Sequence, residues 1–312
     1  MKKQILKQLK TLTGFNCVSG NEADIANYLV RILKPIVDEC SLDSVGNVVA
    51  IKGKPKMCIF SHIDKVGYVA AGCNKKLISV VALKKAKGYP GSNTWPVRIV
   101  SNSVCHSGSL FQDKNEGNLW VKTKEDVSEN IKPGMLVCFD SEFKETKSGI
   151  VITNSLDNCL GITTAIEVIK KAKNICFVGT VQEEMSSLGA MYAAQKLDFE
   201  KVIVLDATYA GKGNSAKLGH GPTICLKDDY WGNKQMIEGL INVAEKLKVD
   251  YQVEVLENGG SDIKGIVFGS AGTKFVFIGI PVEGMHTPYE KADLQDVEKA
   301  AFLLTEFVKN HD

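Results

Sequence analysis

The pattern of apolar and polar residues over the first 66 positions predicts two helices followed by three strands. Apolar residues recur at helical spacing over 2–13, which predicts a helix there. Ser19 and Glu22 form an S-x-x-E pattern typical of a capping box, so we expect a second helix to open at this point. Pro35 is expected to end that helix. Short apolar runs predict strands at 37–42, 48–51 and 57–60.

Between 67 and 149 the helical period disappears. Short apolar runs alternate there with Gly, Asn, Lys and Pro. This alternation is typical of a small all-β domain or barrel. The predicted strands lie at 68–71, 77–83, 97–100, 119–121 and 136–139.

From 150 onward, helical and strand patterns alternate. Helices are predicted at 156–172, 188–197, 234–247 and 294–308, the last with Asp293 as its N-cap. Strands are predicted at 175–181, 202–205, 251–256 and 274–280. Continuous apolar strands between helices are typical of a sheet covered on both faces. We therefore expect one α/β domain formed by residues 1–66 and 150–312, with a β domain inserted at 67–149.

Composition excludes several classes of protein. The 312 residues are 44% hydrophobic and 24% charged, which is enough apolar material for a buried core. The net charge of 38 − 36 = +2 argues against a nucleic-acid partner. No run of about 18 apolar residues and no signal-peptide pattern occurs, so no membrane partner is expected. The nine cysteines form no C-x-x-C pair, which favours a reduced, cytoplasmic protein.

Five polar clusters follow strand-like runs, where open α/β sheets bind their ligands. Their candidate residues are His62, Asp64, Asp157, Glu183, Glu184, Asp206 and His286. Each has an ordinary structural explanation on its own: a hydrogen-bonded histidine, an aspartate that caps a helix, or a glutamate pair at a helix N-terminus. Together, two histidines and three carboxylates suit a pair of divalent ions such as Zn²⁺, Co²⁺ or Mn²⁺.

The residue types also supply the other parts of a two-metal centre. Two ions can share a carboxylate and a water of lowered pKa, and a nearby carboxylate can take its proton. In the Glu183-Glu184 pair, one residue can bind metal while its neighbour acts as that base. Asp64 can accept a hydrogen bond from the second ring nitrogen of His62 and fix its tautomer. No reaction follows from this inventory alone.

At these residues the sequence resembles the dinuclear-metal aminopeptidases that include glutamyl aminopeptidases and the tetrahedral TET particles. Members of this family are often also labelled cellulase or endoglucanase. The resemblance covers nearly the whole chain, and eight ordered motifs make it specific. They are VSGNEADIANYL, SVGNVVAIKG, FSHIDKVGYV, NSLDNCLGITTAIEV, TVQEEMSSLGA, VLDATYA, NGGSDIKGI and MHTPYEKADLQDVEKA.

The resemblance implies a metallopeptidase domain with a central mixed sheet flanked by helices, interrupted by a small inserted β-barrel-like domain. That inserted domain would serve oligomerisation or substrate access. Two divalent ions, Zn²⁺ or Co²⁺ with Mn²⁺ as an alternative, would be bound by His62 with Asp206, by Glu184 with His286, and by Asp157 as the bridge. Glu183 would be the general base, and Asp64 the partner of His62.

The implied activity is that of an aminopeptidase acting on short peptides with a free N-terminus. A hydroxide bridging the two ions, deprotonated by Glu183, would attack the first peptide bond. Glu183 would then protonate the leaving amine. The resemblance also implies a homo-oligomer, from a dimer up to a dodecamer, although the short inserted domain favours the smaller assemblies.

The sequence departs from the family pattern at two places. Lys65 stands where an acidic residue is common, and Asn158-Cys159 replaces the usual Asp-Arg. Because the implied ligands and base are all present, these departures bear on substrate preference rather than on metal binding. The native metal and the preferred N-terminal residue stay open.

Three alternative functions remain at this point. One is a deacylase or amidase that uses the same metals, and another is a non-catalytic relative that binds peptides or scaffolds a complex. Endoglucanase activity is the least favoured, because glycoside hydrolysis normally uses two carboxylates and no dinuclear metal centre.

Several further residues receive only modest roles. Asp262, in the Gly-rich GGSD loop, is given none, and His220 is a candidate border of the substrate pocket. The remaining histidines are expected to be structural or solvated, and the barrel aromatics to lie in its core or in oligomer contacts: His106, His311, Tyr89, Trp95 and Trp120.

Overall fold

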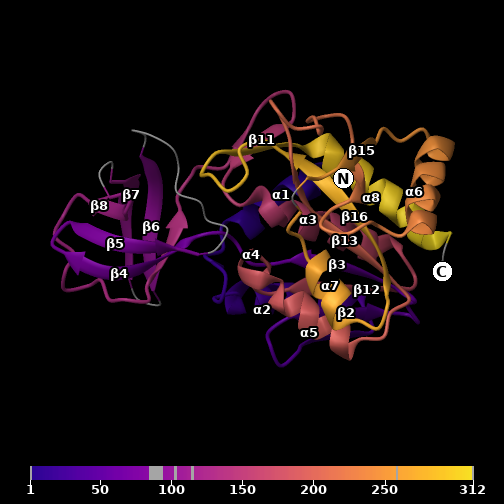
Figure 1. Ribbon diagram of the computed structural model, residues 1–312, viewed down its shortest axis with the longest axis horizontal. Coiled ribbons are helices and arrows are strands. Elements are labelled where there is room, and N and C mark those ends of the chain that lie inside the picture. The colour runs from indigo at the N-terminus through magenta and orange to yellow at the C-terminus, as the bar shows by residue number, and fades with distance from the viewer. Residues whose placement is uncertain (1, 84–93, 102–103, 114–115, 258, 311–312) are drawn as a thin grey trace.

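A large α/β body and a smaller β-barrel lie side by side in the computed structural model (Figure 1). It describes residues 2–83, 94–101, 104–113, 116–257 and 259–310, so Tyr89 and His311 fall outside the described residues. Within this part of the chain, no helix combines the length and the apolar character needed to cross a membrane. All nine cysteines are free thiols.

The α/β body is built on a mixed eight-stranded sheet. In spatial order its strands are β1 (Glu39–Leu42), β2 (Val48–Lys52), β12 (Ile175–Thr180), β3 (Met57–His62), β13 (Lys201–Tyr209), β16 (Lys274–Val282), β14 (Thr223–Lys227) and β15 (Gln252–Val255). The four central strands, β12, β3, β13 and β16, run parallel. Every residue of β12 and β3 is buried, as expected where helices cover both faces of a sheet.

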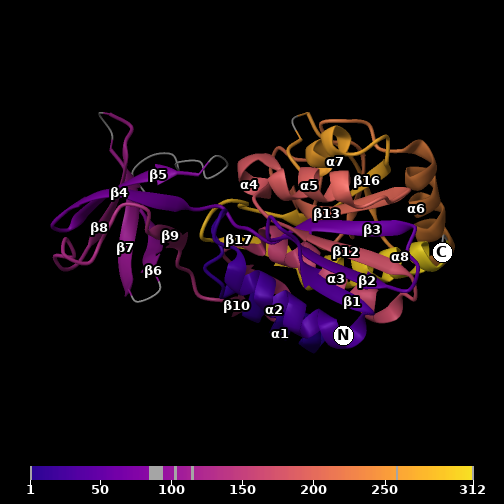
Figure 2. The same ribbon diagram turned by 90° about the horizontal axis from the view of Figure 1, so that it is seen from below.

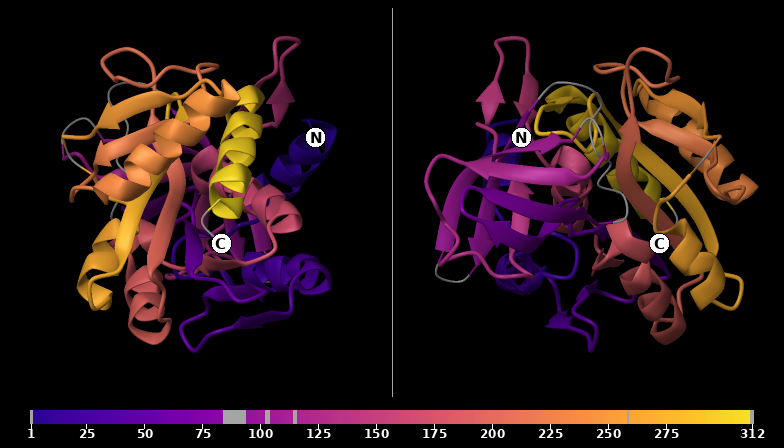
Figure 3. Two further views of the ribbon diagram at one scale, coloured as in Figure 1. Left: turned by 90° about the vertical axis from the view of Figure 1, so that its right-hand side faces the viewer. Right: turned by 60° about the vertical axis from the view of Figure 1, so that its left-hand side comes forward.

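Helices cover the two faces of this sheet in two layers, as Figure 2 shows. The larger layer contains α1 (Lys2–Thr13), α2 (Ala23–Leu33), α3 (Leu156–Lys171), α6 (Lys234–Leu247) and α8 (Leu294–Lys309). The smaller layer contains α5 (Leu188–Lys196) and α7 (Ile263–Gly269), with the one-turn helix α4 (Glu183–Ser186) beside α5. Helices α6 and α8 lie side by side at the end of the body remote from the barrel (Figure 3).

The barrel is closed by six antiparallel strands. In order around it they are β4 (Tyr68–Asn74), β5 (Leu77–Ala82), β8 (Leu119–Thr123), β7 (Val104–Gln112), β6 (Trp95–Ser101) and β9 (Leu136–Phe139), which pairs back onto β4. Its core contains Tyr68, Ile99 and Val121, all fully buried. Trp95 packs edge-on against Phe139, with ring centroids 5.5 Å apart, as expected for an aromatic residue of the barrel core.

The chain enters and leaves the barrel next to the end of β3. It enters directly after His62, and it returns through β10 (Lys144–Glu145) and β11 (Ile150–Thr153). Strand β11 pairs with β17 (Glu290–Asp293) to form a separate three-stranded sheet. The segment that re-enters the body therefore continues directly into Asp157 at the start of α3.

The predicted fold class, an α/β domain with a mixed sheet flanked by helices and a small β-barrel, is confirmed. The helices predicted at 2–13 and 234–247 match the observed bounds, and Asp293 accepts a hydrogen bond at the start of α8. Five strands were missed: β7, β10, β11, β14 and β17. Strand β7 (VCHSGSLFQ) and strand β17 (EKAD) are rich in polar residues, and their pairing partners rather than their own apolar pattern make them strands.

The predicted capping box is wrong. Helix α2 begins at Ala23, and the side chain of its N-cap residue, Glu22, makes no capping hydrogen bond. The Ser19 hydroxyl donates instead to Asp64 Oδ2 at 2.7 Å, and Glu22 Oε1 accepts from the backbone of Gly20 at 2.7 Å. Tertiary partners therefore hold the two side chains that a local rule assigned to the helix terminus.

Lys65 has a structural function. Its side chain is buried, and its ammonium donates to the carbonyls of Leu12, Thr13 and Phe15 at 3.1, 3.0 and 2.7 Å. These carbonyls lie at the end of α1, where a helix leaves acceptors unpaired and where a cation is favoured. Lys65 therefore ties α1 to the segment that follows β3, and its position is explained by the fold.

We expect Lys65→Met to lower the free energy of unfolding by about 3 kcal/mol, because three buried carbonyls lose a charged donor. Urea denaturation followed by circular dichroism measures the change. Lys10→Met is the matched control, since Lys10 lies exposed in the last turn of the same helix. This substitution should lower the free energy of unfolding by less than about 0.5 kcal/mol. Equal costs for the two variants would contradict the assigned function of Lys65.

Candidate metal centre

The seven candidate site residues come from five separate segments that meet at one edge of the large sheet. His62 ends β3, and the neighbouring residue of β12, Thr180, precedes Glu183 and Glu184 in α4. Asp206 lies within β13 rather than after it, because that strand continues to Tyr209. The carboxyl ends of β3, β12 and β13 point the same way, which is where open α/β sheets bind ligands.

One group of candidate ligands surrounds the Nε2 atom of His62. This nitrogen lies 3.0 Å from Asp157 Oδ1 and 3.2 Å from Asp206 Oδ1. All three side chains are buried, and ligand atoms of the three lie within 4.8 Å of one another. Asp157 and Asp206 lie 95 and 144 positions after His62 along the chain. The pairing of β13 with β3 brings Asp206 beside His62, and the start of α3 brings Asp157 to the same place.

A second group surrounds the Nε2 atom of His286. This nitrogen lies 3.0 Å from Asp157 Oδ2 and 3.5 Å from Glu184 Oε1. Asp157 therefore presents one carboxylate oxygen to each histidine. Glu183 also points into this region, with Oε2 at 3.9 Å from His62 Nε2.

The acidic surroundings change the protonation of both histidines. Burial disfavours the charged imidazolium of His286, but the carboxylates of Glu184 and Asp157 outweigh it and raise the pKa to about 12. The pKa of His62 is raised well above its usual value against the same burial effect, by Asp206, Asp157 and Asp64. Burial would raise the pKa of Asp157, whereas hydrogen bonds from His286 and His62 lower it strongly.

Asp64 lies behind His62, away from the other ligands. The Nδ1 atom of His62 is 3.2 Å from the Asp64 backbone oxygen and 3.4 Å from Oδ1 of its carboxylate. Burial would raise the pKa of the Asp64 carboxyl, but hydrogen bonds from His62, Ser19 and the Glu184 backbone hold it below its usual value. Asp64 is thus a charged, fully buried residue that orients the His62 ring.

Four successive backbone N–H groups at the end of β12 are held by buried side chains. The N–H of Val181 donates to Asn47 Oδ1, that of Gln182 to Glu22 Oε1, that of Glu183 to Asp64 Oδ1 and that of Glu184 to Asp64 Oδ2, at 3.0, 3.1, 3.1 and 3.0 Å. A one-turn helix cannot satisfy these donors internally. The position of the glutamate pair therefore depends on three residues from other parts of the chain.

Glu290 is a site residue that the sequence reasoning missed. Its buried carboxylate accepts from the backbone of Asp157 at 3.1 Å and of His286 at 2.8 Å. Burial and the charge of Asp157 raise its pKa to about 8. The only sequence signal was a charged residue that follows His286 by four positions, which by itself resembles a surface glutamate.

Asn158, one of the two departures from the family pattern, connects three elements. Its amide donates to Ser61 Oγ at 3.0 Å and to the backbone oxygen of Leu205 at 2.9 Å, and its Oδ1 accepts from Gly161 at 3.0 Å. Ser61 and Leu205 directly precede His62 and Asp206. Asn158 therefore sets the start of α3 against the two strands that carry these ligands.

Four of the five candidate ligands line a cavity of about 260 Å³, together with Glu183: His62, Asp157, Asp206 and His286. Its other walls are partly apolar, from Leu256, Phe277 and Met285, and partly the Gly-rich loop at Gly259–Ser261. His220, a candidate border of this cavity, lies instead in a separate hollow with Lys217 and Tyr251. Asp262 lies beneath the loop, and its carboxylate accepts a hydrogen bond from the Thr180 hydroxyl. Burial raises the pKa of Asp262 to about 7.

The donor set fits a pair of divalent metal ions. Three groups among the described residues combine imidazole nitrogen with carboxylate oxygen, which are the ligands that Zn²⁺, Co²⁺ and Mn²⁺ accept: His62 with Asp157 and Asp206, His286 with Asp157 and Glu184, and His62 with Glu183 and Glu184. Asp157 belongs to two of these groups and lies between the two histidines. So many carboxylates within one buried cavity are costly without cations to balance them.

Comparison with known proteins gives one family and several structures with the same fold. The chain matches the family described as M42 glutamyl aminopeptidase over residues 118–303. A candidate aminopeptidase of Acetivibrio thermocellus is 30% identical over 321 residues, which cover 96% of this chain and 97% of that protein.

Two solved structures superimpose on nearly the whole chain. The TET aminopeptidase of Thaumarchaeota archaeon SCGC AB-539-E09 has a TM-score of 0.91 at 24% identity and covers 99% of this chain and 97% of its own. The TET1 peptidase of Pyrococcus horikoshii, which can assemble into a tetrahedron or a large octahedral shell, has a TM-score of 0.83 at 21% identity and covers 97% and 99%.

The raised histidine pKa values predict proton release on metal uptake. The surrounding carboxylates raise the pKa of both imidazoles, which favours the protonated rings when no metal is bound, and a ligating nitrogen must lose its proton. We expect roughly two protons per chain at pH 7, and weaker metal binding as the pH falls. The number of protons released is measured by calorimetry, in which Zn²⁺ is titrated into chelator-treated protein in buffers of different ionisation enthalpy.

His106→Gln is the control for this count, because His106 lies on barrel strand β7 and outside both ligand groups. The number of protons released should not change in this variant. Zn²⁺ binding without proton release would show that the histidines are already neutral.

Proposed function

The chain belongs to the M42 glutamyl aminopeptidase family, and from this premise we propose that it removes the N-terminal residue of short peptides with the help of two divalent metal ions. The observation that carries this proposal is the Asp157 carboxylate, which faces a histidine with each of its oxygens at 3.0 Å. A carboxylate placed between two N/O donor groups is suited to bridge two ions.

In this proposal the two ions have separate ligands around the shared one. His62 and Asp206 would hold one ion, Glu184 and His286 would hold the other, and Asp157 would be shared between them. Zn²⁺ and Co²⁺ are the ions best suited to two imidazoles and three carboxylates, with Mn²⁺ next. When bound, such a pair polarises the scissile carbonyl and lowers the pKa of a water between the ions.

Glu183 moves the proton. Its carboxylate is buried beside His62 and lies in the cavity next to the ligand groups, without a place among the five ligands. It takes one proton from the water whose oxygen bonds to the carbonyl carbon and delivers it to the nitrogen of the leaving amine, so that the peptide C–N bond breaks. The second water proton stays on the new carboxyl group and then passes to the free amine, so the products are a carboxylate and an ammonium group. Asp64 holds the His62 ring during this cycle through Nδ1.

The size of the cavity supports removal of single residues. Its volume of about 260 Å³ is below the roughly 300–1,000 Å³ typical of pockets that enclose a drug-sized ligand. A cavity of this volume accommodates one terminal residue beside the metal site. Longer chains would have to extend out of it, as expected for an exopeptidase.

We also propose that the chain forms a homo-oligomer and that its two parts divide the work. Residues 1–66 and 150–312 would form the catalytic unit, and residues 67–149 the part that contributes to assembly or substrate access. The support is the closed barrel, whose core is separate from that of the α/β body. A further support is the fold shared with the P. horikoshii TET1 peptidase, which can assemble into a tetrahedron or a large octahedral shell.

A substrate panel tests the proposed function. Free-amine dipeptides, aminoacyl anilides and their N-acetylated forms are incubated with the metal-loaded protein, and amine release is followed. We expect hydrolysis of the free-amine substrates only. Cleavage restricted to N-acetylated forms would indicate a deacylase or amidase, and no turnover with stoichiometric metal bound would indicate a peptide-binding relative.

Two substitutions test the division of roles between carboxylates. Glu183→Gln should keep its metal and lose about 10²- to 10⁴-fold in kcat, because it removes the proton carrier alone. Asp157→Asn should lose metal as well as activity. Metal content by mass spectrometry and kcat with an aminoacyl anilide are the measurements, and Glu200→Gln, an exposed glutamate, is the control. Metal loss in Glu183→Gln would mean that Glu183 is a ligand.

A further inference from the structure

The S-x-x-E turn at Ser19–Glu22 is a sequence feature that neither the fold nor the proposed function has used. It was expected to cap α2, but both of its polar side chains reach away from that helix. Ser19 donates to the Asp64 carboxylate at 2.7 Å, and Glu22 accepts from Gln182 at 3.1 Å. Each contact ends next to the proposed general base.

Glu22 is placed to fix the residue that precedes Glu183. Its side chain is 6% exposed, and the same oxygen, Oε1, accepts from the backbone of Gly20 and of Gln182. Gln182 has a left-handed backbone with φ of 54°, a conformation that a non-glycine residue rarely adopts without support. A hydrogen bond to its N–H is such a support.

The hydrogen bond between Gln182 and Glu22 is one of four that hold the successive backbone N–H groups from Val181 to Glu184. Asn47 holds the N–H before it, and Asp64 holds the two after it. Of these three acceptor residues, Asp64 also contacts His62, and the Asn47 amide donates to the backbone of Gly189 at 2.9 Å. The other hydrogen bond of Glu22 stays within its own turn, at Gly20, so its removal tests the bond to Gln182, the residue before Glu183.

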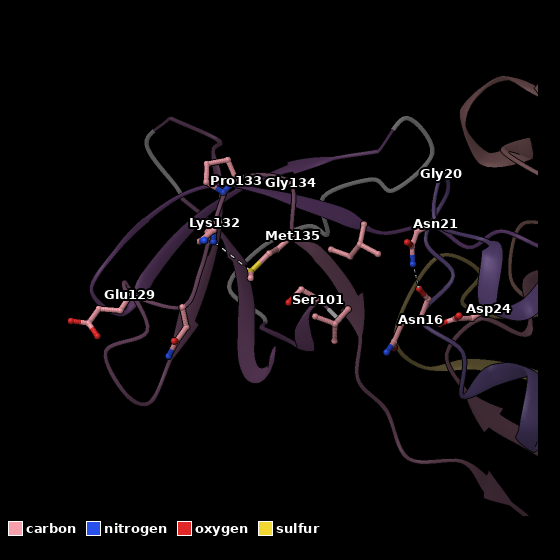
Figure 4. Close-up of a pocket in the computed structure, with 13 residues that line it drawn as sticks. Asn16, Gly20, Asn21, Asp24, Ser101, Glu129, Lys132, Pro133, Gly134 and Met135 are labelled. Atoms are coloured by element: carbon pink, nitrogen blue, oxygen red, sulfur yellow. Dashed lines mark hydrogen bonds between the residues drawn. The ribbon is translucent and has the colours of Figure 1, made fainter. Parts of the chain in front are cut away.

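The segment before the turn contacts the barrel, whereas the outer side of the turn lines a cleft. Val18 packs against Val100 and Cys138 of the barrel, and Arg98 donates to Asn16 Oδ1 at 3.0 Å. Gly20 and Asn21 line one wall of an open cleft of about 1170 Å³, and Lys132 and Met135, which precede β9, line the other (Figure 4). The bonds from Ser19 and Glu22 link this anchored segment to the residues around Glu183.

We infer that Glu22 is a positioning residue for the reaction, which acts by holding the Gln182 N–H and thereby the carboxylate of Glu183 in the cavity. This inference rests on the proposed function, because it takes Glu183 as the proton carrier. A shift of a catalytic group by about 1 Å can cost 10²-fold in rate. The effect of Glu22 therefore falls on kcat and leaves metal and substrate binding in place.

The first experiment compares Glu22→Ala with Glu22→Gln in the full-length, metal-loaded protein. The alanine variant should lose between about tenfold and a hundredfold in kcat, with KM changed less than about threefold. The glutamine variant should stay within about threefold of the unmodified protein, because its amide oxygen can accept the same two hydrogen bonds. Metal content and the melting temperature are measured for both variants.

Asp24→Ala is the matched control. Asp24 lies two residues further on, is exposed, lines the same cleft and lies in the first turn of α2. Loss of this carboxylate should leave kcat unchanged within about twofold. A loss as large as that of Glu22→Ala would show that any disturbance of this segment lowers activity, and the inference would be wrong.

A double-mutant cycle separates positioning from a general structural effect. In the Glu183→Gln background, Glu22→Ala should lower the residual kcat by less than about twofold, because the group it positions is already gone. Multiplicative losses would show that Glu22 acts independently of Glu183. Equal losses in Glu22→Gln and Glu22→Ala would likewise contradict the inference, since the acceptor would then be irrelevant.

The outcomes for this inference are distinct from those for the proposed function. If the unmodified protein hydrolyses no free-amine peptide, the proposed function fails before any variant is compared. If the unmodified protein hydrolyses free-amine peptides and Glu22→Ala retains full kcat, only the positioning role of Glu22 is contradicted.

Discussion

The buried carboxylate of Asp64 is the interaction on which the arrangement of the site depends. A fully buried charge is tolerated only when donors surround it. Asp64 meets this requirement with the His62 ring, the Ser19 hydroxyl and the backbone N–H groups of Glu183 and Glu184. These donors come from the end of β3, the loop after α1 and the turn after β12. Satisfying one charge therefore fixes three segments relative to one another.

The sheet aligns the candidate ligands with one another. Parallel pairing of β3 with β12 and β13 brings His62, the glutamate turn and Asp206 to one edge. The barrel leaves the body immediately after β3 and returns just before α3, so both ends of the insertion adjoin metal-site segments. Glu290 completes the arrangement, because it holds the backbones of Asp157 and His286 from β17.

The sequence predicted the parts of this structure that follow from periodicity and from residue type. The central strands and long helices bury continuous apolar faces, and these are visible in the pattern of residues. The candidate site residues come from five segments that meet at one edge of the sheet, and their individual roles are proposals. What could not be predicted are the contacts set by tertiary structure. The S-x-x-E pattern satisfied a local rule, yet Ser19 found a stronger acceptor in Asp64. Lys65 and Asn158 appeared as departures from a family pattern, while the structure shows both as buried connectors.

The paired imidazoles around Asp157 have a consequence for the order of events in the life of the chain. The raised pKa of both rings favours their protonated form, whose positive charge offsets the repulsion between the carboxylates around them. Small zinc domains remain unfolded until their metal arrives, because nothing else balances their ligands. We therefore expect a newly made chain of this protein to complete its fold before metal ions bind.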